Sequence, residues 1–221
     1  MFHIVLHEPE IPFNTGAIGR TCVATGSSLH LIYPLGFIIN DKYVKRAGMD
    51  YWPKLDLHEY DDYDDFLAKH REIIYNGETE RLSREETERL SREETECLSH
   101  EEAEQVDYEN ADPHYEECVH SNLNDGTSRP KLWFATTKAR QCYSDVRFGP
   151  DDYIMFGKES AGIPEEILVE HPEACIRIPM LGDTRSLNLS NSVAIVLYEA
   201  LRQNNFQGLN EKGNLHRLKW E

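Results

Sequence analysis

Short apolar segments rich in β-branched and aromatic residues alternate along this chain with segments of helical pattern, and this alternation constrains the fold more than any other feature. The apolar segments predict strands at 2–6, 29–33, 54–58, 131–136, 153–157 and 175–178. The segments between them predict helices at 14–25, 41–47, 61–70, 164–170 and 188–204. Such alternation is typical of an α/β fold with a mainly parallel sheet flanked by helices.

Several helix ends carry recognisable signals. Asn14 is expected to cap the first helix, and Gly26 follows it where a left-handed conformation favours glycine. Pro164 suits the first position of a helix, and Asn188 with Ser190 opens the last one. These signals set the expected helix bounds.

The stretch 178–199 joins a strand end, a polar loop and the start of an apolar helix. The loop at 182–186 carries Asp183 and Arg185. Small polar residues between a strand and a helix leave backbone amides and carbonyls free, which is how many nucleotide-like ligands are held. The alternative for this stretch alone is a capped core helix after an ordinary loop.

Two further segments complete a set with the C-terminal stretch. Near the N-terminus, Asn14, Arg20 and Gly26 are spaced six residues apart. At 153–164 a strand runs into a turn with the sequence Gly-Lys-Glu-Ser-Ala-Gly. In this order, the three segments resemble the three motifs of the SPOUT superfamily of RNA ribose methyltransferases.

Two flanking stretches, 7–16 and 46–51, make the resemblance closer. They are similar to the bacterial family that methylates the ribose 2′-hydroxyl at the wobble nucleotide, position 34, of tRNA. The resemblance covers about 2–70 and 131–206, and three motifs in order are far more specific than one. It implies an AdoMet-dependent enzyme acting on the anticodon stem-loop of tRNA. The alternatives are another RNA target, such as rRNA, and a non-catalytic RNA- or protein-binding module.

The resemblance also implies an architecture that pattern alone would not suggest. The family ties its C-terminal segment into a trefoil knot, a topology that general folding rules disfavour. We therefore expect a single domain at 1–206 with this knot, an acidic insertion at 73–130 and a C-terminal tail at 207–221. The family's sites are completed across a subunit interface, which implies a homodimer.

For AdoMet, the resemblance implies a pocket within the knot, contacted by strand ends and loops. The main chain would read the adenine, and apolar side chains would line its faces. The implied cofactor-binding residues are Ala135, Gly157, Ile178, Met180, Ser186, Leu187 and Asn188.

Arg20 is the residue to which the resemblance assigns the central catalytic task. Methyl transfer requires alignment of a ribose hydroxyl with the methyl group and removal of its proton. A guanidinium normally stays protonated, so Arg20 either loses its proton transiently or grips a phosphate and polarises the hydroxyl. A surface arginine in an ion pair is the plain alternative.

Other motif residues have two interpretations each. Asn14 either caps its helix, positions the RNA backbone, or does both, and Ser190 either starts the last helix or assists catalysis. Glu159 is either a solvated turn carboxylate or an anchor at the site and dimer surface, and the resemblance favours the anchor. Gly157 would allow close approach of the ligand. Gly162 and Gly26 are expected to support the site structurally.

The net charge of −17 at first argues against a nucleic acid partner. Residues 71–129 hold 18 Asp and Glu and 6 Arg, a net charge of −12, so the other 162 residues carry only −5. This segment contains an eight-residue repeat whose leucines 82, 90 and 98 rotate by about 80° per repeat on a helix, which excludes a continuous coiled-coil seam. We expect a solvated, partly helical or disordered insertion; a docking arm is the alternative.

Several functional classes find no support in the sequence. No apolar run approaches the about 20 residues of a membrane span, and the N-terminus reads as a strand instead of a signal peptide. Five scattered cysteines lack a CxxC pair, and the ten histidines form no metal motif, so no metal is expected. A reducing cytoplasm is the simplest compartment.

Overall fold

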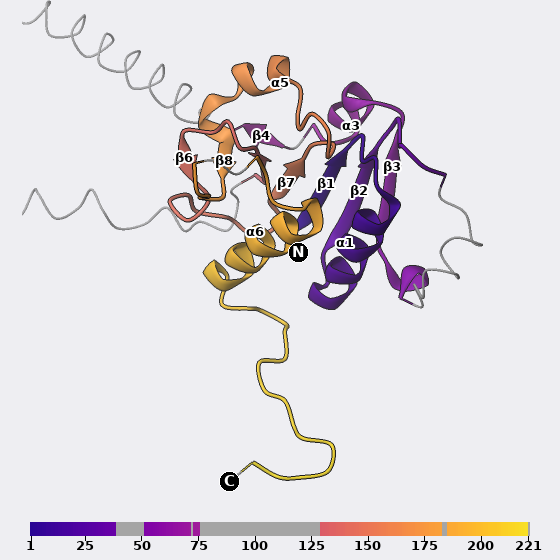
Figure 1. The fold of residues 1–221 in the computed structure, drawn as a ribbon, viewed down its shortest axis with the longest axis vertical. Coiled ribbons are helices and arrows are strands. Elements are labelled where there is room, and N and C mark those ends of the chain that lie inside the picture. The colour runs from indigo at the N-terminus through magenta and orange to yellow at the C-terminus, as the bar shows by residue number, and fades with distance from the viewer. Residues whose placement is uncertain (39–50, 72, 76–128, 183–184, 221) are drawn as a thin grey trace, which may run out of the picture. The chain divides into compact units, whose positions relative to one another are not determined.

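The computed structural model describes residues 1–38, 51–71, 73–75, 129–182 and 185–220 (Figure 1). The helix predicted at 41–47 and nearly all of the insertion predicted at 73–130 lie outside these residues. One compact unit comprises Met1–Gly77 and Pro130–Glu221.

The described strands form one eight-stranded sheet in which every pairing between strands is parallel. The order is β3-β2-β1-β7-β5-β8-β6, and β4 pairs with β5 outside this path. The prediction of a mainly parallel α/β fold is confirmed. The strands are β1 (His3–His7), β2 (Ser28–Ile32), β3 (Leu57–Tyr60), β4 (Ile74–Tyr75), β5 (Lys131–Ala135), β6 (Gln141–Cys142), β7 (Tyr153–Phe156) and β8 (Cys175–Arg177).

Helices cover both faces of the sheet because the buried strands are apolar on both sides. On one face, Ile4 and Leu6 of β1 share a core with α1 (Pro12–Thr25) and α6 (Leu189–Gln203). On the other face, Val5 shares a second core with α3 (Tyr63–Lys69) and α5 (Glu165–Glu170). Figure 1 shows α1 and α6 lying side by side on their face, and the two helices are in contact.

The prediction that Asn14 caps the first helix is wrong. Helix α1 begins two residues earlier, at Pro12, and its N-cap residue is Ile11. Proline suits a first helical position because its backbone is already set for the helix. The side chain of Asn14 makes tertiary hydrogen bonds instead. At the other end, Gly26 adopts the predicted left-handed conformation, with φ of 67°, and its N–H donates to the Cys22 carbonyl.

Other element bounds differ in detail from the predicted ones. The strand predicted at 54–58 is displaced: a 3₁₀ turn η1 (Trp52–Lys54) occupies its start, and β3 begins at Leu57, which pairs with Leu29. Pro164 is the N-cap residue of α5, not its first helical residue. Strands β4 and β6 and the 3₁₀ turn η2 (Pro172–Ala174) were not predicted, because two or three residues are too few to show a period.

The last helix is fastened at its C-terminal end to the segment between β6 and β7. Gln203 donates from Nε2 to the Val146 carbonyl and accepts from the Phe148 N–H through Oε1. Asn204 donates to the Phe148 carbonyl. Beyond it, the described residues 209–220 include no helix or strand, and Figure 1 shows this tail leading away from the sheet. No helix in the described ranges is both long and apolar enough to span a membrane.

Candidate functional site

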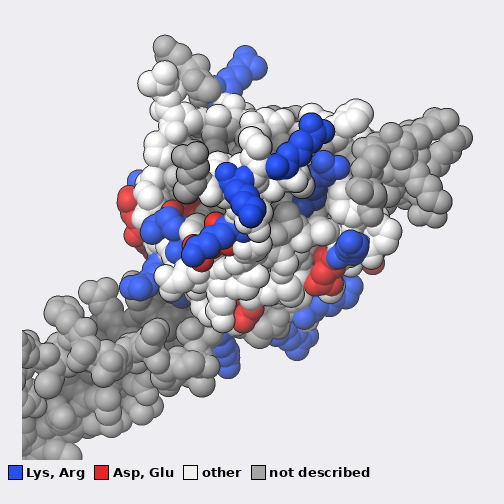
Figure 2. All heavy atoms as spheres, turned by 90° about the horizontal axis from the view of Figure 1, so that it is seen from below, with Lys and Arg blue, Asp and Glu red and all other residues white. Residues whose placement is uncertain are grey.

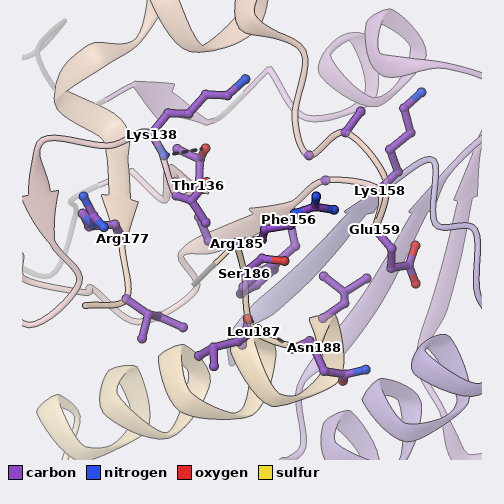
Figure 3. Close-up of a pocket in the computed structure, with 18 of the residues that line it drawn as sticks. Thr136, Lys138, Phe156, Lys158, Glu159, Arg177, Arg185, Ser186, Leu187 and Asn188 are labelled. Atoms are coloured by element: carbon purple, nitrogen blue, oxygen red, sulfur yellow. Dashed lines mark hydrogen bonds between the residues drawn. The ribbon is translucent and has the colours of Figure 1, made fainter. Parts of the chain in front are cut away.

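A cavity of about 700 Å³ lies where the strands β5, β7 and β8 end (Figure 3). The residues after these strands line it, together with the starts of α1 and α6. Ligands of open parallel sheets bind in the crevice at the carboxyl ends of the strands, between the loops that follow them. All seven residues expected to bind the cofactor line the cavity: Ala135, Gly157, Ile178, Met180, Ser186, Leu187 and Asn188.

A chain of hydrogen bonds joins the three sequence motifs beside this cavity. Asn14 of α1 donates from Nδ2 to Glu159 Oε1 over 2.8 Å. Its Oδ1 accepts from Asn188 Nδ2 over 3.0 Å. Asn14 is buried, with 7% of its surface exposed, and a buried amide needs hydrogen-bond partners for both its oxygen and its nitrogen. One amide therefore links the turn after β7 to the start of α6.

Asn188 continues this chain into the last helix. Its Oδ1 accepts from the Ser190 and Asn191 backbone N–H groups, which is the N-cap arrangement expected from the sequence. The Ser190 hydroxyl donates to the same oxygen over 2.6 Å. Ser190 thus supports Asn188 from the helix and is not among the residues that line the cavity.

Glu159 anchors the loop that follows β1. Its carboxylate accepts from the Glu10 N–H over 2.8 Å and from the Ile11 N–H over 3.3 Å, besides Asn14. These bonds support the anchor interpretation of Glu159 over that of a solvated carboxylate. These bonds hold the start of α1 against the turn after β7.

The same loop and turn are joined by a second set of contacts. Ser160 donates to Glu10 through its N–H and its hydroxyl, each over 2.9 Å, and these bonds lower the pKa of Glu10. Lys158 Nζ lies 2.7 Å from Glu8 Oε2, and this partner raises the pKa of Lys158. The turn 157–162 is thus bonded to the loop after β1 through Lys158, Glu159 and Ser160.

Gly157 has a geometric role different from the one expected. A Cβ there would lie 2.0 Å from the carbonyl carbon of Gly162 and 2.1 Å from the nitrogen of Ile163. The absence of a side chain at Gly157 therefore allows the backbone of Gly162 and Ile163 to pack against it, whereas we expected it to allow close approach of the ligand. Gly162 closes the turn with φ of 76°, a conformation that favours glycine.

Besides Ser190, two further expected site residues lie outside the cavity of this chain. Gly26 caps the far end of α1, where its role is structural. Arg20 is exposed on α1, six residues after Asn14, and its guanidinium carbon lies 4.9 Å from the centroid of the Tyr51 ring. Six residues turn a helix by about 240°, so the two side chains leave it on different sides.

Sequence reasoning missed a set of cations around the cavity. Lys138, Lys158, Arg177 and Arg185 all line it, while Glu159 is the one acidic lining residue in the described part of the chain. Only Arg185 among them was named from the sequence, as part of the loop at 182–186. Lys138 and Lys158 closely follow predicted strands and Arg177 lies near the end of another, and these positions were the available signal. Two of these cations are paired with carboxylates, Lys158 with Glu8 and Lys138 with Glu165, so the positive charge around the cavity is partly balanced.

The sequence matches the SpoU rRNA Methylase family over residues 1–108 and 81–198. A tRNA (cytidine(34)-2'-O)-methyltransferase of Photorhabdus asymbiotica is 37% identical to it over 209 residues, which covers 94% of this chain and 97% of that protein.

Solved structures agree with the sequence match. A Bacillus anthracis protein is 32% identical, with a TM-score of 0.67 over 95% of this chain and 98% of that one. A structure described as giving insight into 2-OH methylation of C/U34 on tRNA is also 32% identical. Its TM-score is 0.63, and the alignment covers 93% of this chain and 97% of that chain.

Proposed function

Because this chain belongs to the SpoU rRNA methylase family, we propose that it is an AdoMet-dependent methyltransferase of the ribose 2′-hydroxyl at the wobble nucleotide, position 34, of tRNA. One observation carries the proposal beyond family membership: the three motifs meet through hydrogen bonds beside a single cavity.

The cavity fits AdoMet in size and lining. Its volume of about 700 Å³ lies within the range of about 300–1,000 Å³ that small-molecule sites occupy. Apolar side chains such as Ile178, Met180 and Leu187 can pack against an adenine, and the loops offer backbone groups to its edge. AdoMet supplies an activated methyl group with a neutral leaving group. The seven cofactor residues named above would hold it.

The chain's own residues then align the ribose and assist proton removal. Arg20 would grip a phosphate next to the reacting nucleotide and polarise the hydroxyl, or take its proton transiently. Asn14, buried between Glu159 and Asn188, would position the RNA backbone beside the cavity. Ser190 would act indirectly, by holding the Asn188 side chain.

In a homodimer, the Arg20 of one subunit would lie at the cavity of the other subunit. Arg20 lies outside the cavity of its own chain, so the Arg20 of a second copy is the natural candidate to complete the site. Exposed apolar residues on the two adjacent helices support an interface there: Phe13 of α1 is 78% exposed and Tyr198 of α6 is 47% exposed. Light scattering of the purified chain tests this state, and a monomer with full activity would contradict it.

The C-terminal trefoil knot remains part of the proposal. Two features support it. The chain leaves β8, lines the cavity at 185–189 and enters α6, which packs against α1 and β7. The segment at 146–148 is hydrogen-bonded to the end of α6, so the connection from β5 to β7 lies against this helix. A segment passing through that connection would form the knot.

We retain the domain organisation as a proposal: one methyltransferase domain at 1–206, an acidic insertion at 73–130 and a tail at 207–221. The anticodon stem-loop is the proposed RNA segment, and the cytoplasm the proposed compartment. Figure 2 shows Lys and Arg side chains gathered on the side from which the tail leaves. Exposed Lys212, Arg217 and Lys219 belong to that tail. Local cations of this kind support RNA binding despite the negative total charge.

Methyl transfer from labelled AdoMet to unmodified cellular tRNA, followed by mapping of the methylated nucleotide, tests the proposal. Label on the ribose of nucleotide 34 is the expected result. Label at another site, or on rRNA alone, would keep the reaction class and overturn the substrate. Arg20→Ala should abolish turnover while AdoMet binding, measured by calorimetry, persists. No transfer and no AdoMet binding would favour the non-catalytic module.

A further inference from the structure

Tyr51 touches α1 at two points close to Arg20. The face of its ring lies against the guanidinium of Arg20, with 4.9 Å between the guanidinium carbon and the ring centroid. Its hydroxyl donates to the carbonyl of Gly16, one turn earlier in the helix, over 2.5 Å. A cation within about 6 Å of an aromatic centroid is attracted by the electron-rich face of the ring. The ring is therefore both tethered to the helix and in contact with its arginine.

The turn that carries Tyr51 is held against the helix independently of Arg20. The N–H groups of Lys54 and Leu55 donate to the carbonyls of Tyr51 and Trp52. Gly19 leaves room for this turn, since a Cβ there would lie 3.1 Å from the Trp52 ring and 3.2 Å from a Leu55 methyl. Leu55 packs against the core. The ring thus has a fixed place on the surface of α1.

A fixed ring changes what Arg20 can do. A long exposed arginine samples many rotamers and loses that freedom when it grips a substrate. Contact with the ring restricts it beforehand. The ring face also favours the charged guanidinium over a neutral one. Of the two roles left open for Arg20, the contact supports the cationic one, in which it grips phosphate and polarises the hydroxyl.

We propose that Tyr51 is a positioning residue that holds the cationic guanidinium of Arg20 in the orientation used for methyl transfer. This inference rests on the proposed function, in which Arg20 acts on the RNA. It assigns to Tyr51 no contact with AdoMet, because neither residue lines the cavity.

Steady-state methyl transfer to tRNA by the full-length chain tests the role of the ring. Tyr51→Leu removes the ring face and should lower kcat about tenfold. Tyr51→Phe keeps the face and removes the hydroxyl that donates to Gly16, so its loss of kcat should be smaller, about twofold. The Kd for AdoMet should stay the same in both variants. Equal loss in both variants, or wild-type kcat in Tyr51→Leu, would overturn the inference.

A double-mutant cycle separates positioning from a general structural effect. In an Arg20→Lys background, Tyr51→Leu should lower kcat by a clearly smaller factor than in the wild type, because the guanidinium it holds is absent. Trp52→Leu is the matched control: it disturbs the same turn without removing the ring over Arg20, so its factor should be the same in both backgrounds. An equal factor for Tyr51→Leu in both backgrounds would make Tyr51 merely structural.

The wild-type assay distinguishes this inference from the proposed function. If the wild-type chain transfers no methyl group to tRNA, the proposed function fails and the Tyr51 inference falls with it. If the wild type is active, Arg20→Ala is inactive and Tyr51→Leu matches the wild type, the Tyr51 inference alone is wrong.

Discussion

At the residue scale, Gly157 has the closest neighbours to its ideal Cβ position among the glycines in the described ranges. The atoms at 2.0 and 2.1 Å from its ideal Cβ belong to the backbone of Gly162 and Ile163, so no side-chain rotation relieves the clash. The turn that must move also carries Glu159, which holds the start of α1. A larger residue at Gly157 should therefore lower the stability of the fold and change the shape of the cavity.

We predict that Gly157→Ala destabilises the fold by about 1–3 kcal/mol and weakens AdoMet binding. Thermal unfolding and calorimetric titration with AdoMet measure the two effects. Gly182→Ala is the matched control, because it lies in another loop at the cavity edge and its Cβ would meet nothing within 4 Å. Equal melting temperatures for the two variants would contradict the steric argument.

At the scale of elements, the buried carboxylate of Asp152 joins β5 to the start of β7. Its oxygens accept from the Lys131 N–H over 2.9 Å, the Trp133 indole N–H over 2.8 Å and the Gly149 N–H over 2.9 Å. Only 2% of the residue is exposed. Desolvation raises its pKa, and the three hydrogen bonds oppose that shift. The carboxylate thus accepts from three donors at once, two on β5 and one in the segment before β7.

Asp152→Ala should cost about 3 kcal/mol or more, because several buried donors lose their acceptor at once. Asp152→Asn should cost less, since one oxygen remains, while its amide nitrogen would face N–H donors. Asp151→Asn is the control: that neighbouring carboxylate has a side chain 61% exposed and should change stability by about 0.5 kcal/mol or less. Urea unfolding measures all three, and a cost for Asp152→Ala as small as that of the control would refute the link.

A second buried network joins the strands β1, β2, β3 and β7 to the end of α3. His3 Nδ1 lies 3.0 Å from His30 Nε2, and His30 Nδ1 lies 2.7 Å from the Tyr60 hydroxyl. That hydroxyl lies 2.7 Å from His70 Nε2, and the Tyr153 hydroxyl lies 3.1 Å from His70 Nδ1. Burial lowers the pKa of His30 to about 2 and that of His3 to about 4.

These lowered values make the fold sensitive to acid. Below pH 6.5, His3 and His30 bind protons in the unfolded chain but stay neutral in the fold. The free energy of unfolding therefore falls as pH drops. The loss contributed by His3 ends near pH 4, where it titrates in the fold, and that of His30 continues to lower pH. Above pH 6.5 both contributions are complete.

We predict that His30→Phe flattens the dependence of melting temperature on pH between pH 7.5 and 5, because one of the two groups no longer titrates. Differential scanning calorimetry across this range measures the slope. His216→Gln, in the exposed tail, should leave the wild-type slope. A His30→Phe profile parallel to that of the wild type would show that His30 does not contribute to the acid sensitivity.

At the scale of the whole molecule, the short strand β4 lies at the start of the insertion predicted at 73–130 and pairs in parallel with β5, which follows the insertion. Two neighbouring parallel strands need a crossover of about a dozen residues or more. The segment between them is far longer, so most of it is in excess of what the sheet requires. It also carries most of the negative charge.

Replacement of residues 78–127 by about twelve Gly and Ser residues should preserve the fold and methyl transfer, since the crossover remains long enough. Removal of the repelling acidic residues should also strengthen tRNA binding at low salt. Melting temperature, activity and tRNA affinity measure these effects. Direct joining of the same ends, without the linker, is the control and should destabilise the pairing of β4. An insoluble or inactive linker variant would show that the insertion is part of the enzyme.

Much of the architecture was predictable from the chain alone. Alternating apolar segments predicted the parallel sheet, and three motifs in order predicted the family. The helix start at Asn188 and the left-handed Gly26 followed from local signals. Such features depend on neighbours in sequence, where propensity and capping act directly.

Other features depend on residues far apart in the chain, and only the tertiary structure decided them. From the local sequence, Asn14 was predicted to cap a helix. In the structure its amide is hydrogen-bonded to Glu159 and Asn188, 145 and 174 residues away. The steric role of Gly157 arises because the turn folds back onto it. The sequence by itself indicated the seven residues expected to bind the cofactor, and the structure places all seven around one cavity. Folding decided which of them touch, because hydrogen bonds and close contacts form between surfaces that only the sheet brings together.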